Sequence, residues 1–308
     1  MPPERTAHDW VLDVERRFRQ SGLHFGHGTD NALDEAAWLV LHAIGKPLDG
    51  TFRDWRMAVD EAAAGRIEQI ARTRCETRQP LAYLLGEAWF AGLPFFVDER
   101  VLVPRSPIAE LIDEGFYPWV ADLEGRRVLD LCCGGGCIGI AIAVRHGVAQ
   151  VDLADISPAA IELAGENVER HHVGNRTSLY ESDLFAALED RRYDLVVSNP
   201  PYVPADSVDA LPREYRAEPR LGLESGRDGL DIPLSILLDA PRHLCEDGVL
   251  VCEVGESQER LADLLPRVPF TWLDFARGGS GVFVLDREQL LEAAPAVRNA
   301  IGNRSHVT

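Results

Sequence analysis

Strand-like and helical segments alternate from about residue 106 onward, and this alternation limits the fold more than any other feature of the chain. Near-continuous apolar strands separated by helices are typical of a mostly parallel sheet that helices cover on both faces. A Gly-rich turn within 270–286 separates two further apolar segments, which predicts a closing antiparallel hairpin. The segments predicted as strands are 126–131, 150–156, 177–183, 193–199 and 248–255, and those predicted as helices are 137–147, 157–172, 230–244 and 257–266. The predicted fold class is therefore α/β.

The N-terminal region has a different pattern, with apolar residues at helical spacing. Helices are predicted over 10–18, 33–44 and 55–75. Asn31 is expected to cap the second of them, because its side chain can accept a hydrogen bond from the first turn. This region is predicted to form a small helical domain.

A β-hairpin is predicted between the two regions, because residues 86–104 place aromatic and β-branched residues around Gly92 and Pro94. The segment after residue 287 is predicted as a weak helix that frays. The predicted organisation is a helical domain (1–85), a hairpin linker (86–104), an α/β domain (105–287) and a C-terminal tail (288–308).

Net charge, apolar segments and cysteine content indicate which partners and which cellular compartment to expect. The net charge of −19 repels nucleic-acid phosphates and attracts a basic protein, although solubility alone also explains such a charge. No apolar segment of a signal peptide is seen near the N-terminus, and the apolar run 137–144 is too short to cross a bilayer. The six cysteines form no spaced framework. We expect a reduced, cytoplasmic protein that does not enter a membrane.

A glycine-rich loop follows the first predicted strand of the α/β domain, in LDLCCGGGCIGIA (129–141). Its segment 134–139 matches the pattern G-x-G-x-x-G, and it follows a strand and opens a helix as that pattern requires. Asp155 lies about twenty positions further on, at the tip of the second strand. Ligands of open α/β sheets bind at the carboxyl ends of the strands. The loop therefore predicts a site for an adenosine-containing ligand, the alternative being a tight turn with no ligand.

NAD and S-adenosylmethionine are the rival ligands, because both need a glycine loop and an acidic residue for ribose hydroxyls. Asp130 ends the first strand, where its carboxylate would repel a pyrophosphate but tolerates an amino group and a sulfonium. The second feature is Asn199-Pro200-Pro201-Tyr202 at the end of the fourth strand. Hydride transfer gives this motif no clear task, whereas methyl transfer to nitrogen does. The sequence favours S-adenosylmethionine.

The Asn-Pro-Pro-Tyr motif suits methyl transfer to a planar NH2 group, such as an amide or the exocyclic amine of a base. Such a nitrogen is a poor nucleophile and must be held in line with the methyl group. The side-chain oxygen of Asn199 and the carbonyl of Pro200 can accept its two hydrogens, while Pro201 stiffens the loop and Tyr202 packs on the planar group. The predicted catalysis uses position and electrostatics and needs no strong base.

In this order, the glycine loop, Asp155, ESDLF (181–185) and the Asn-Pro-Pro-Tyr motif resemble a class I methyltransferase, and specifically the HemK-type glutamine-amide methyltransferases, over nearly the whole chain. The resemblance implies a Rossmann-like domain with a mostly parallel seven-stranded sheet, S-adenosylmethionine as cofactor and a glutamine side chain held by the motif. It implies that Asp155, with Ile156 beside it, lies at the ribose hydroxyls. It places Asp183 and Leu184 along the adenine edge. By the same resemblance, the methionine part of the cofactor lies against Cys132, Cys133, Gly134, Gly135 and Gly136, next to Asp130 and Asn199.

The chain departs from the family pattern in this loop. Cys132 stands where the first glycine of the family loop is usual, and Cys133 stands where threonine is usual. Cysteine is expected to fit at position 132 on the condition that φ there is negative.

Other segments resemble the branch of the family that methylates a glutamine of large-subunit ribosomal protein three. These segments are 26–36, 89–112 and 215–230. The release-factor branch typically has Pro-Arg-Pro where this chain has Pro104-Arg105-Ser106-Pro107. An acidic enzyme would also be steered onto a basic ribosomal protein, free or in an assembling particle. The helical domain is the expected docking surface.

Alternatives from other classes stay open on the sequence. They are a release-factor glutamine methyltransferase, an adenine-directed nucleic acid methyltransferase, a non-catalytic assembly factor and an NAD dehydrogenase. A flipped base needs a basic groove, which the net charge opposes. Arg105 faces either a ligand carboxylate or an ion-pair partner within the protein. The spacing of Cys132, Cys133 and Cys137 fits no zinc pattern, so no metal is expected.

Overall fold

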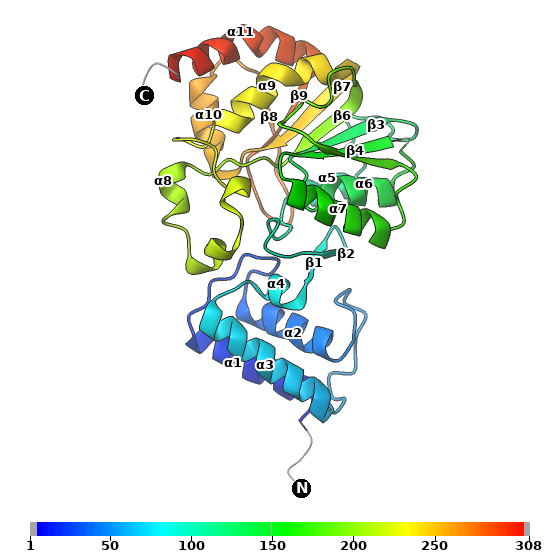
Figure 1. Cartoon of the computed structure of the whole chain (residues 1–308), viewed down its shortest axis with the longest axis vertical. Helices are drawn as coiled ribbons and strands as arrows, with labels where there is room; N and C mark the ends of the chain where they lie inside the picture. Colours follow the sequence, from blue (N-terminus) through cyan, green and yellow to red (C-terminus); the bar gives the residue numbers. More distant parts are fainter. Residues whose placement is uncertain (1–4, 149, 305–308) are drawn as a thin grey trace. The chain divides into compact units, whose positions relative to one another are not determined.

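The structure, a computed structural model, describes residues 5–148 and 150–304. The chain forms two compact units, which are described separately (Figure 1). Unit 1 comprises Met1–Glu99, Val103–Arg105 and Pro212–Glu218, and unit 2 comprises the remainder. The segments 103–105 and 212–218 thus belong to the helical unit, although the sequence pattern groups 212–218 with the α/β domain. No helix in the described part of the chain is long and apolar enough to cross a membrane.

Unit 1 is a small helical bundle with a β-hairpin. Its elements are α1 (Ala7–Gln20), α2 (Ala32–Ala43), α3 (Glu61–Thr77), α4 (Leu81–Leu85), β1 (Glu87–Phe90), β2 (Leu93–Phe96) and the 3-10 turn η1 (Arg213–Ala217). Asn31 caps α2 as predicted, accepting from the backbone N–H groups of Leu33 and Asp34. The third helix begins at Glu61 and not at 55, because Asp60 is its cap and accepts from the backbone N–H of Ala63. The predicted hairpin is confirmed over a shorter span.

Unit 2 is a seven-stranded sheet with helices on both faces. Its strands are β3 (Arg127–Leu131), β4 (Gln150–Asp155), β5 (Thr177–Glu181), β6 (Tyr193–Ser198), β7 (Leu244–Glu253), β8 (Thr271–Trp272) and β9 (Val282–Asp286). Its helices are α5 (Ile108–Asp113), α6 (Cys137–Arg145), α7 (Pro158–Arg170), α8 (Ala205–Val208), α9 (Asp231–His243), α10 (Gln258–Leu264) and α11 (Arg287–Arg304), with 3-10 turns η2 (Arg220–Gly222) and η3 (Gly255–Ser257).

The strand order in the sheet is β5-β4-β3-β6-β7-β9-β8. The first five strands in this order are parallel, and β9 pairs antiparallel with both of its neighbours, β7 and β8. Figure 1 shows α6 and α7 on one face of the sheet and α9 and α11 on the other. The predicted fold class is confirmed, including the mostly parallel seven-stranded sheet and its antiparallel closing strands.

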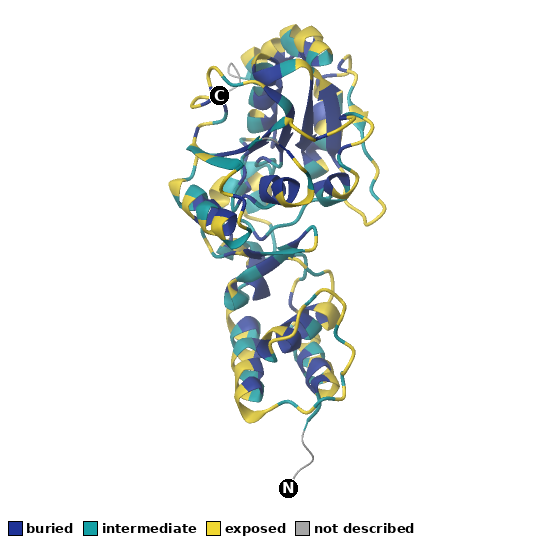
Figure 2. Cartoon of the chain, turned by 90° about the vertical axis from the view of Figure 1, so that its right-hand side faces the viewer, coloured by how far each residue is buried: buried dark blue, intermediate teal, exposed yellow. Residues whose placement is uncertain are grey.

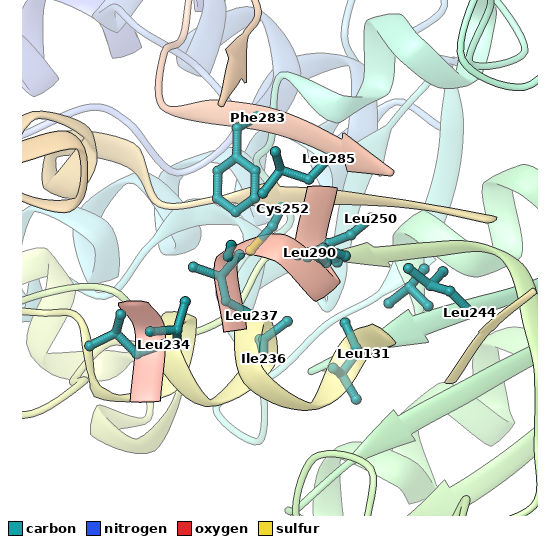
Figure 3. Close-up of a cluster of buried hydrophobic side chains, with 14 of the residues drawn as sticks. Leu131, Leu234, Ile236, Leu237, Leu244, Leu250, Cys252, Phe283, Leu285 and Leu290 are labelled. Carbon is teal, nitrogen blue, oxygen red and sulfur yellow. The ribbon is translucent and has the colours of Figure 1, made fainter. Parts of the chain in front are cut away.

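The core of unit 2 lies between the central strands and the helices that cover them. In Figure 2 the central strands are mostly buried, whereas the helices expose their outward sides, and the edge strands β5 and β8 have no buried residue. On one face, Leu250 and Cys252 of β7 join Phe283 of β9 and Leu237 of α9 in a cluster of buried side chains (Figure 3). This packing holds the strands in register, and so it fixes the loops at their carboxyl ends.

The expectation that the chain frays after residue 287 is wrong for the part described to residue 304. Residues Arg287–Arg304 form α11, whose buried residues include Leu290 and Val297. The helix packs along α9, and Arg304 near its end pairs with Asp228 and Asp231. An apolar face covered by a neighbouring helix stabilises a helix whose own sequence propensity is weak.

Candidate active site

The predicted site residues gather at one edge of the sheet of unit 2. Strands β3, β4, β5 and β6 are parallel neighbours, so their carboxyl ends meet there. The glycine loop follows β3, Asp155 ends β4, Asp183 follows β5, and Asn199 follows β6. Segments up to about seventy residues apart in sequence are therefore brought together. This is the edge at which ligands of open α/β sheets bind.

The glycine loop is a close-packed turn into α6. Gly134 and Gly136 have φ of 53° and 77°, a region that favours glycine. A Cβ on Gly136 would lie 3.0 Å from the Ile140 side chain, and one on Gly139 would lie 2.3 Å from the Leu153 side chain. The later glycines of the motif therefore let α6 approach β4. By contrast, a Cβ on Gly134 would meet nothing closer than 3.9 Å, which leaves the start of the loop open.

Asp155 holds the glycine loop at the tip of β4. Its Oδ2 accepts from the backbone N–H of Gly134 at 2.8 Å, and its Oδ1 accepts from that of Ser157 at 2.9 Å. Burial raises the pKa of this carboxyl, and the backbone hydrogen bonds oppose that rise. Each carboxylate oxygen keeps a further lone pair, so Asp155 can still accept from a ligand hydroxyl. Its position matches the prediction from the sequence.

Asp130 lies in β3 and holds the first turn of α6, directly after the glycine loop. The residue is 1% exposed, and its Oδ2 accepts from the backbone N–H of Gly139 at 2.8 Å. Its Oδ1 is buried without a hydrogen-bond partner, and burial raises the pKa to about 7. Because the carboxylate has almost no accessible surface, it affects a ligand through the loop backbone and through its charge. The sequence had suggested a direct encounter with the ligand.

The condition expected for Cys132 does not hold. Its φ is +60°, so a side chain stands in the left-handed region where the family pattern has glycine. The thiols of Cys132, Cys133 and Cys137 all have a pKa raised by burial. None of the six cysteines, all in the described part, forms a disulfide. Among residues 5–148 and 150–304, no group of three or more His, Cys, Asp or Glu side chains is placed to hold a metal ion.

The turn after β5 is tied to the tip of β4. The backbone N–H of Ser182 donates to the Asp155 carbonyl at 2.8 Å, and the Ser182 hydroxyl donates to the Leu184 carbonyl at 2.6 Å. This places Asp183, which is exposed, and Leu184, with φ of +48°, beside Asp155. Ile156, directly after Asp155, is 48% exposed. An exposed apolar side chain here suits the planar face of a base.

The Asn-Pro-Pro-Tyr motif begins beside the glycine loop. Ser198 pairs with Leu131 across β6 and β3, and its hydroxyl donates to the Leu131 carbonyl at 2.7 Å. Asn199 comes next and is partly exposed, and Pro200 is buried. Asn199 therefore leaves the sheet from the strand adjacent to the one that carries the loop. A ligand bound at the glycine loop would therefore lie close to a second molecule held at Asn199.

Tyr202 is fixed by several contacts within unit 2. Its hydroxyl donates to Oε1 of Glu253 at 3.0 Å, and its carbonyl accepts from the Ser257 hydroxyl at 2.8 Å. A Cβ on Gly255 would lie 2.6 Å from the Tyr202 ring. The expectation that Tyr202 packs on the substrate stays a prediction. The structure adds that the aromatic ring is anchored at its hydroxyl end.

Sequence reasoning missed Glu253 and Ser106. Glu253 ends β7, is 5% exposed and accepts from the Ser106 hydroxyl at 2.5 Å as well as from Tyr202. An acidic residue at the carboxyl end of a buried parallel strand was a usable signal, since that edge is where sites form. The Ser106 contact had no local signal, because it joins residues 147 positions apart.

In unit 1, residues from all three segments that carry the resemblance to the ribosomal branch contact one another. Glu218 forms a two-pronged ion pair with Arg105 at 2.6 Å and 2.7 Å. His27, 1% exposed, lies 3.6 Å from Glu218 and packs against the Tyr215 ring. Burial alone would raise the pKa of Glu218, but the Arg105 guanidinium lowers it to about 2. Of the two roles considered for Arg105, the structure supports the ion pair within the protein.

Comparisons with known proteins show what this chain is similar to. The family model described as Methyltransferase small domain matches residues 112–211. A ribosomal protein uL3 glutamine methyltransferase from Xanthomonas campestris pv. campestris is 52% identical over 285 residues, covering 91% of this chain and 92% of that protein. A protein of the same name from Francisella tularensis subsp. tularensis is 42% identical over 296 residues, covering 95% and 94%. Among solved structures, the hMettl16 catalytic domain in complex with an RNA hairpin is 18% identical, covers 92% of this chain and 91% of that chain, and has a TM-score of 0.48.

Proposed function

Because the chain belongs to the family of ribosomal protein uL3 glutamine methyltransferases, we propose that it transfers a methyl group from S-adenosylmethionine to the side-chain amide nitrogen of a glutamine in uL3. The observation that carries the proposal is that Asn199 directly follows β6, the strand that neighbours β3, after which the glycine loop begins. This supports a role for Asn199 and Pro200 as amide acceptors next to the cofactor. The unit-2 fold is that of a class I methyltransferase.

The residues present fit S-adenosylmethionine. Asp155 keeps acceptor capacity for ribose hydroxyls, and the open start of the loop, 132–136, leaves room for the methionine part. Ile156 offers an apolar surface, and Asp183 with Leu184 provides polar and apolar groups beside it for adenine. When bound, the cofactor supplies an electrophilic methyl group on a sulfonium. Burial raises the pKa of Asp130 to about 7, and a sulfonium bound near the loop would favour the ionised form of this carboxyl.

The motif acts by holding the glutamine amide. The Asn199 side-chain oxygen and the Pro200 carbonyl accept the two amide hydrogens, which aims the nitrogen at the methyl group. The accepted hydrogens also leave more electron density on the nitrogen as positive charge develops there. The methylated amide loses a proton readily, so no strong base is needed. Tyr202 and Pro201 give the loop its stiffness.

The cysteines of the loop do not compete for the methyl group. A thiolate beside a sulfonium would be a better nucleophile than an amide. Burial raises the pKa of Cys132, Cys133 and Cys137, so these groups remain neutral thiols at physiological pH. Neutral thiols fit around the soft methionine part of the cofactor without reacting with it.

The acidic surface suits a basic substrate. The net charge of −19 would speed encounter with a ribosomal protein at low ionic strength and weaken binding to nucleic acid. We place the reaction in the cytoplasm, on uL3 either free or within an assembling large subunit. Unit 1 is the proposed docking surface, because its buried ion pairs make it a rigid platform.

The test is a methyl-transfer assay with labelled S-adenosylmethionine that offers purified uL3 and a peptide-chain release factor side by side. Mass spectrometry then locates the added methyl. A single methyl on a glutamine of uL3 is expected. Label on the release factor would keep the chemistry and overturn the substrate. Absence of label on both proteins and on assembling particles, with cofactor binding intact, would overturn the proposed function.

A further inference from the structure

Glu253 lies at the point where the Asn-Pro-Pro-Tyr loop leaves the sheet. Strands β6 and β7 are parallel neighbours, and Ser198 pairs with Cys252. Glu253 follows Cys252 as the last residue of β7, and Asn199 follows Ser198 just beyond the end of β6. The Glu253 side chain is almost wholly buried. Burial of a carboxylate costs free energy unless hydrogen bonds satisfy it, so the hydrogen bonds of Glu253 are needed to keep it at this position.

Two hydroxyl groups donate hydrogen bonds to the carboxylate of Glu253. The backbone N–H of Ile108 donates to the Ser106 hydroxyl at 3.2 Å, and that hydroxyl donates to Oε2 of Glu253 at 2.5 Å. The Tyr202 hydroxyl donates to Oε1 at 3.0 Å. An ionised carboxylate only accepts, so both hydroxyls must point their hydrogens at it. The direction of the Tyr202 hydroxyl is thereby set.

The rest of Tyr202 has little freedom. The Ser257 hydroxyl holds its carbonyl, and a Cβ on Gly229 would lie 2.2 Å from that same carbonyl. Gly255, with φ of +46°, lies so close to the ring that a Cβ there would be 2.6 Å away. A side chain at either glycine would collide with Tyr202, so both positions hold its carbonyl and its ring closely. The hydrogen bond to Glu253 adds a directional contact at the hydroxyl end of the same ring.

We propose that Glu253 is a positioning residue for methyl transfer, which acts through Tyr202 on the two acceptors at Asn199 and Pro200. This inference rests on the proposed function for its chemical readout. Tyr202 is two residues from Pro200, and Pro200 and Pro201 transmit a rotation because each has a fixed φ. A misplacement of about 1 Å costs on the order of a hundredfold in rate when catalysis depends on alignment. Binding of the cofactor by the loop after β3 should not depend on Glu253.

The test compares Glu253→Met, Glu253→Gln and Tyr202→Phe, with Glu259→Gln as the matched control. Met has a similar length and removes both acceptors, whereas Gln keeps an acceptor for one hydroxyl and a donor for the other. Glu259 is exposed on α10, so its substitution removes a charge and no buried contact. We expect Glu253→Met and Tyr202→Phe to lower kcat by roughly 10- to 100-fold. The Kd for S-adenosylmethionine should stay within about twofold, and Glu253→Gln should recover most of the loss.

A double variant makes the test specific. If Glu253 acts through Tyr202, Glu253→Met with Tyr202→Phe should lose little more than either alone. Multiplied losses would show that the residues act independently and would overturn the inference. Unchanged kcat in Glu253→Met would also overturn it, as would a loss of cofactor binding equal to the loss of kcat.

A measurement without turnover separates this inference from the proposed function. The six tyrosines can be labelled with 3-fluorotyrosine, and Tyr202→Phe identifies the fluorine signal of Tyr202. Glu253→Met should shift or broaden that signal in the folded protein, and Glu259→Gln should leave it in place. An unmoved signal overturns the positioning role whether or not uL3 is methylated. A moved signal with a wild-type enzyme inactive on every substrate overturns the proposed function and keeps the contact.

Discussion

The backbone N–H of Gly134 donates to Oδ2 of Asp155 at 2.8 Å, and this hydrogen bond joins the loop after β3 to the tip of β4. The loop and the acidic residue are therefore one structural unit before any ligand arrives. A preformed site loses less entropy on binding than a site that must order itself.

Substitution Asp155→Ala should weaken S-adenosylmethionine binding more than it slows bound-state turnover. It removes the predicted acceptor of ribose hydroxyls and frees the Gly134 N–H. Loss of a hydrogen bond to a charged group costs about 1.5–3 kcal/mol, so Kd should rise by roughly 10- to 100-fold. Isothermal titration calorimetry measures this directly. A variant that binds as tightly as the wild type would contradict the assignment, and Asp190→Ala, at an exposed site, is the control.

Substitution Asn199→Ala should leave the fold and cofactor binding intact and lower kcat by roughly two to three orders of magnitude. The estimate treats one amide acceptor like one donor of an oxyanion hole. Asn199 lies beyond the end of β6, so the sheet does not depend on its side chain. Kinetics with saturating uL3 and a thermal melt of the same sample give both readouts. Wild-type turnover in a folded variant would rule out the acceptor role.

Asp130 predicts a pH dependence of stability. Its pKa is raised from 3.8 to about 7 by burial, so the folded protein holds the proton more tightly than the unfolded chain. Its contribution to stability is therefore full below about pH 4 and is lost as pH rises through about 7. Asp130→Asn removes this pH-dependent loss of stability, because the amide does not titrate. Its side-chain oxygen can still accept a hydrogen bond from the backbone N–H of Gly139.

The free energy of unfolding of wild type, relative to Asp130→Asn, should thus fall by roughly 3 kcal/mol between pH 5 and pH 8. Urea unfolding at several pH values measures the difference. Asp190→Asn is the matched control, because that residue is exposed. A difference that does not change with pH would show that Asp130 titrates normally.

The strain of a side chain at position 132, where the backbone is left-handed, can be measured by comparison with position 133. Ala and Gly variants are made at 132, where φ is +60°, and at 133, which is not among the positive-φ residues. Gly at 132 should be more stable than Ala by about 1 kcal/mol, because a Cβ is strained there. At 133 the order should reverse. Urea unfolding of the four variants gives the two differences, and the same order at both sites would contradict the argument.

Local patterns in the sequence predicted most of the fold. Asn31 caps α2 as predicted, since capping depends only on residues within one turn. The five parallel strands follow from short apolar runs between helices. The tip position of Asp155 and the start of the motif at Asn199 follow from where those strands end.

Contacts between distant segments were beyond such patterns. The helix α11 looked weak because its stability comes from α9, and Arg105 had two open roles until Glu218 was found beside it. The sign of φ at Cys132 depends on how the loop turns under the packing of α6 against β4.

By itself the sequence determined the α/β class and predicted the cofactor loop and the amide-directed motif, because each of these depends on residues that are close together along the chain. Only the tertiary structure decided that Glu253 holds Tyr202, that Asp130 is enclosed and that Asp155 is bound to Gly134. The physical reason is that hydrogen bonds and burial depend on distance in space, and the sheet brings together strand ends that lie far apart in sequence.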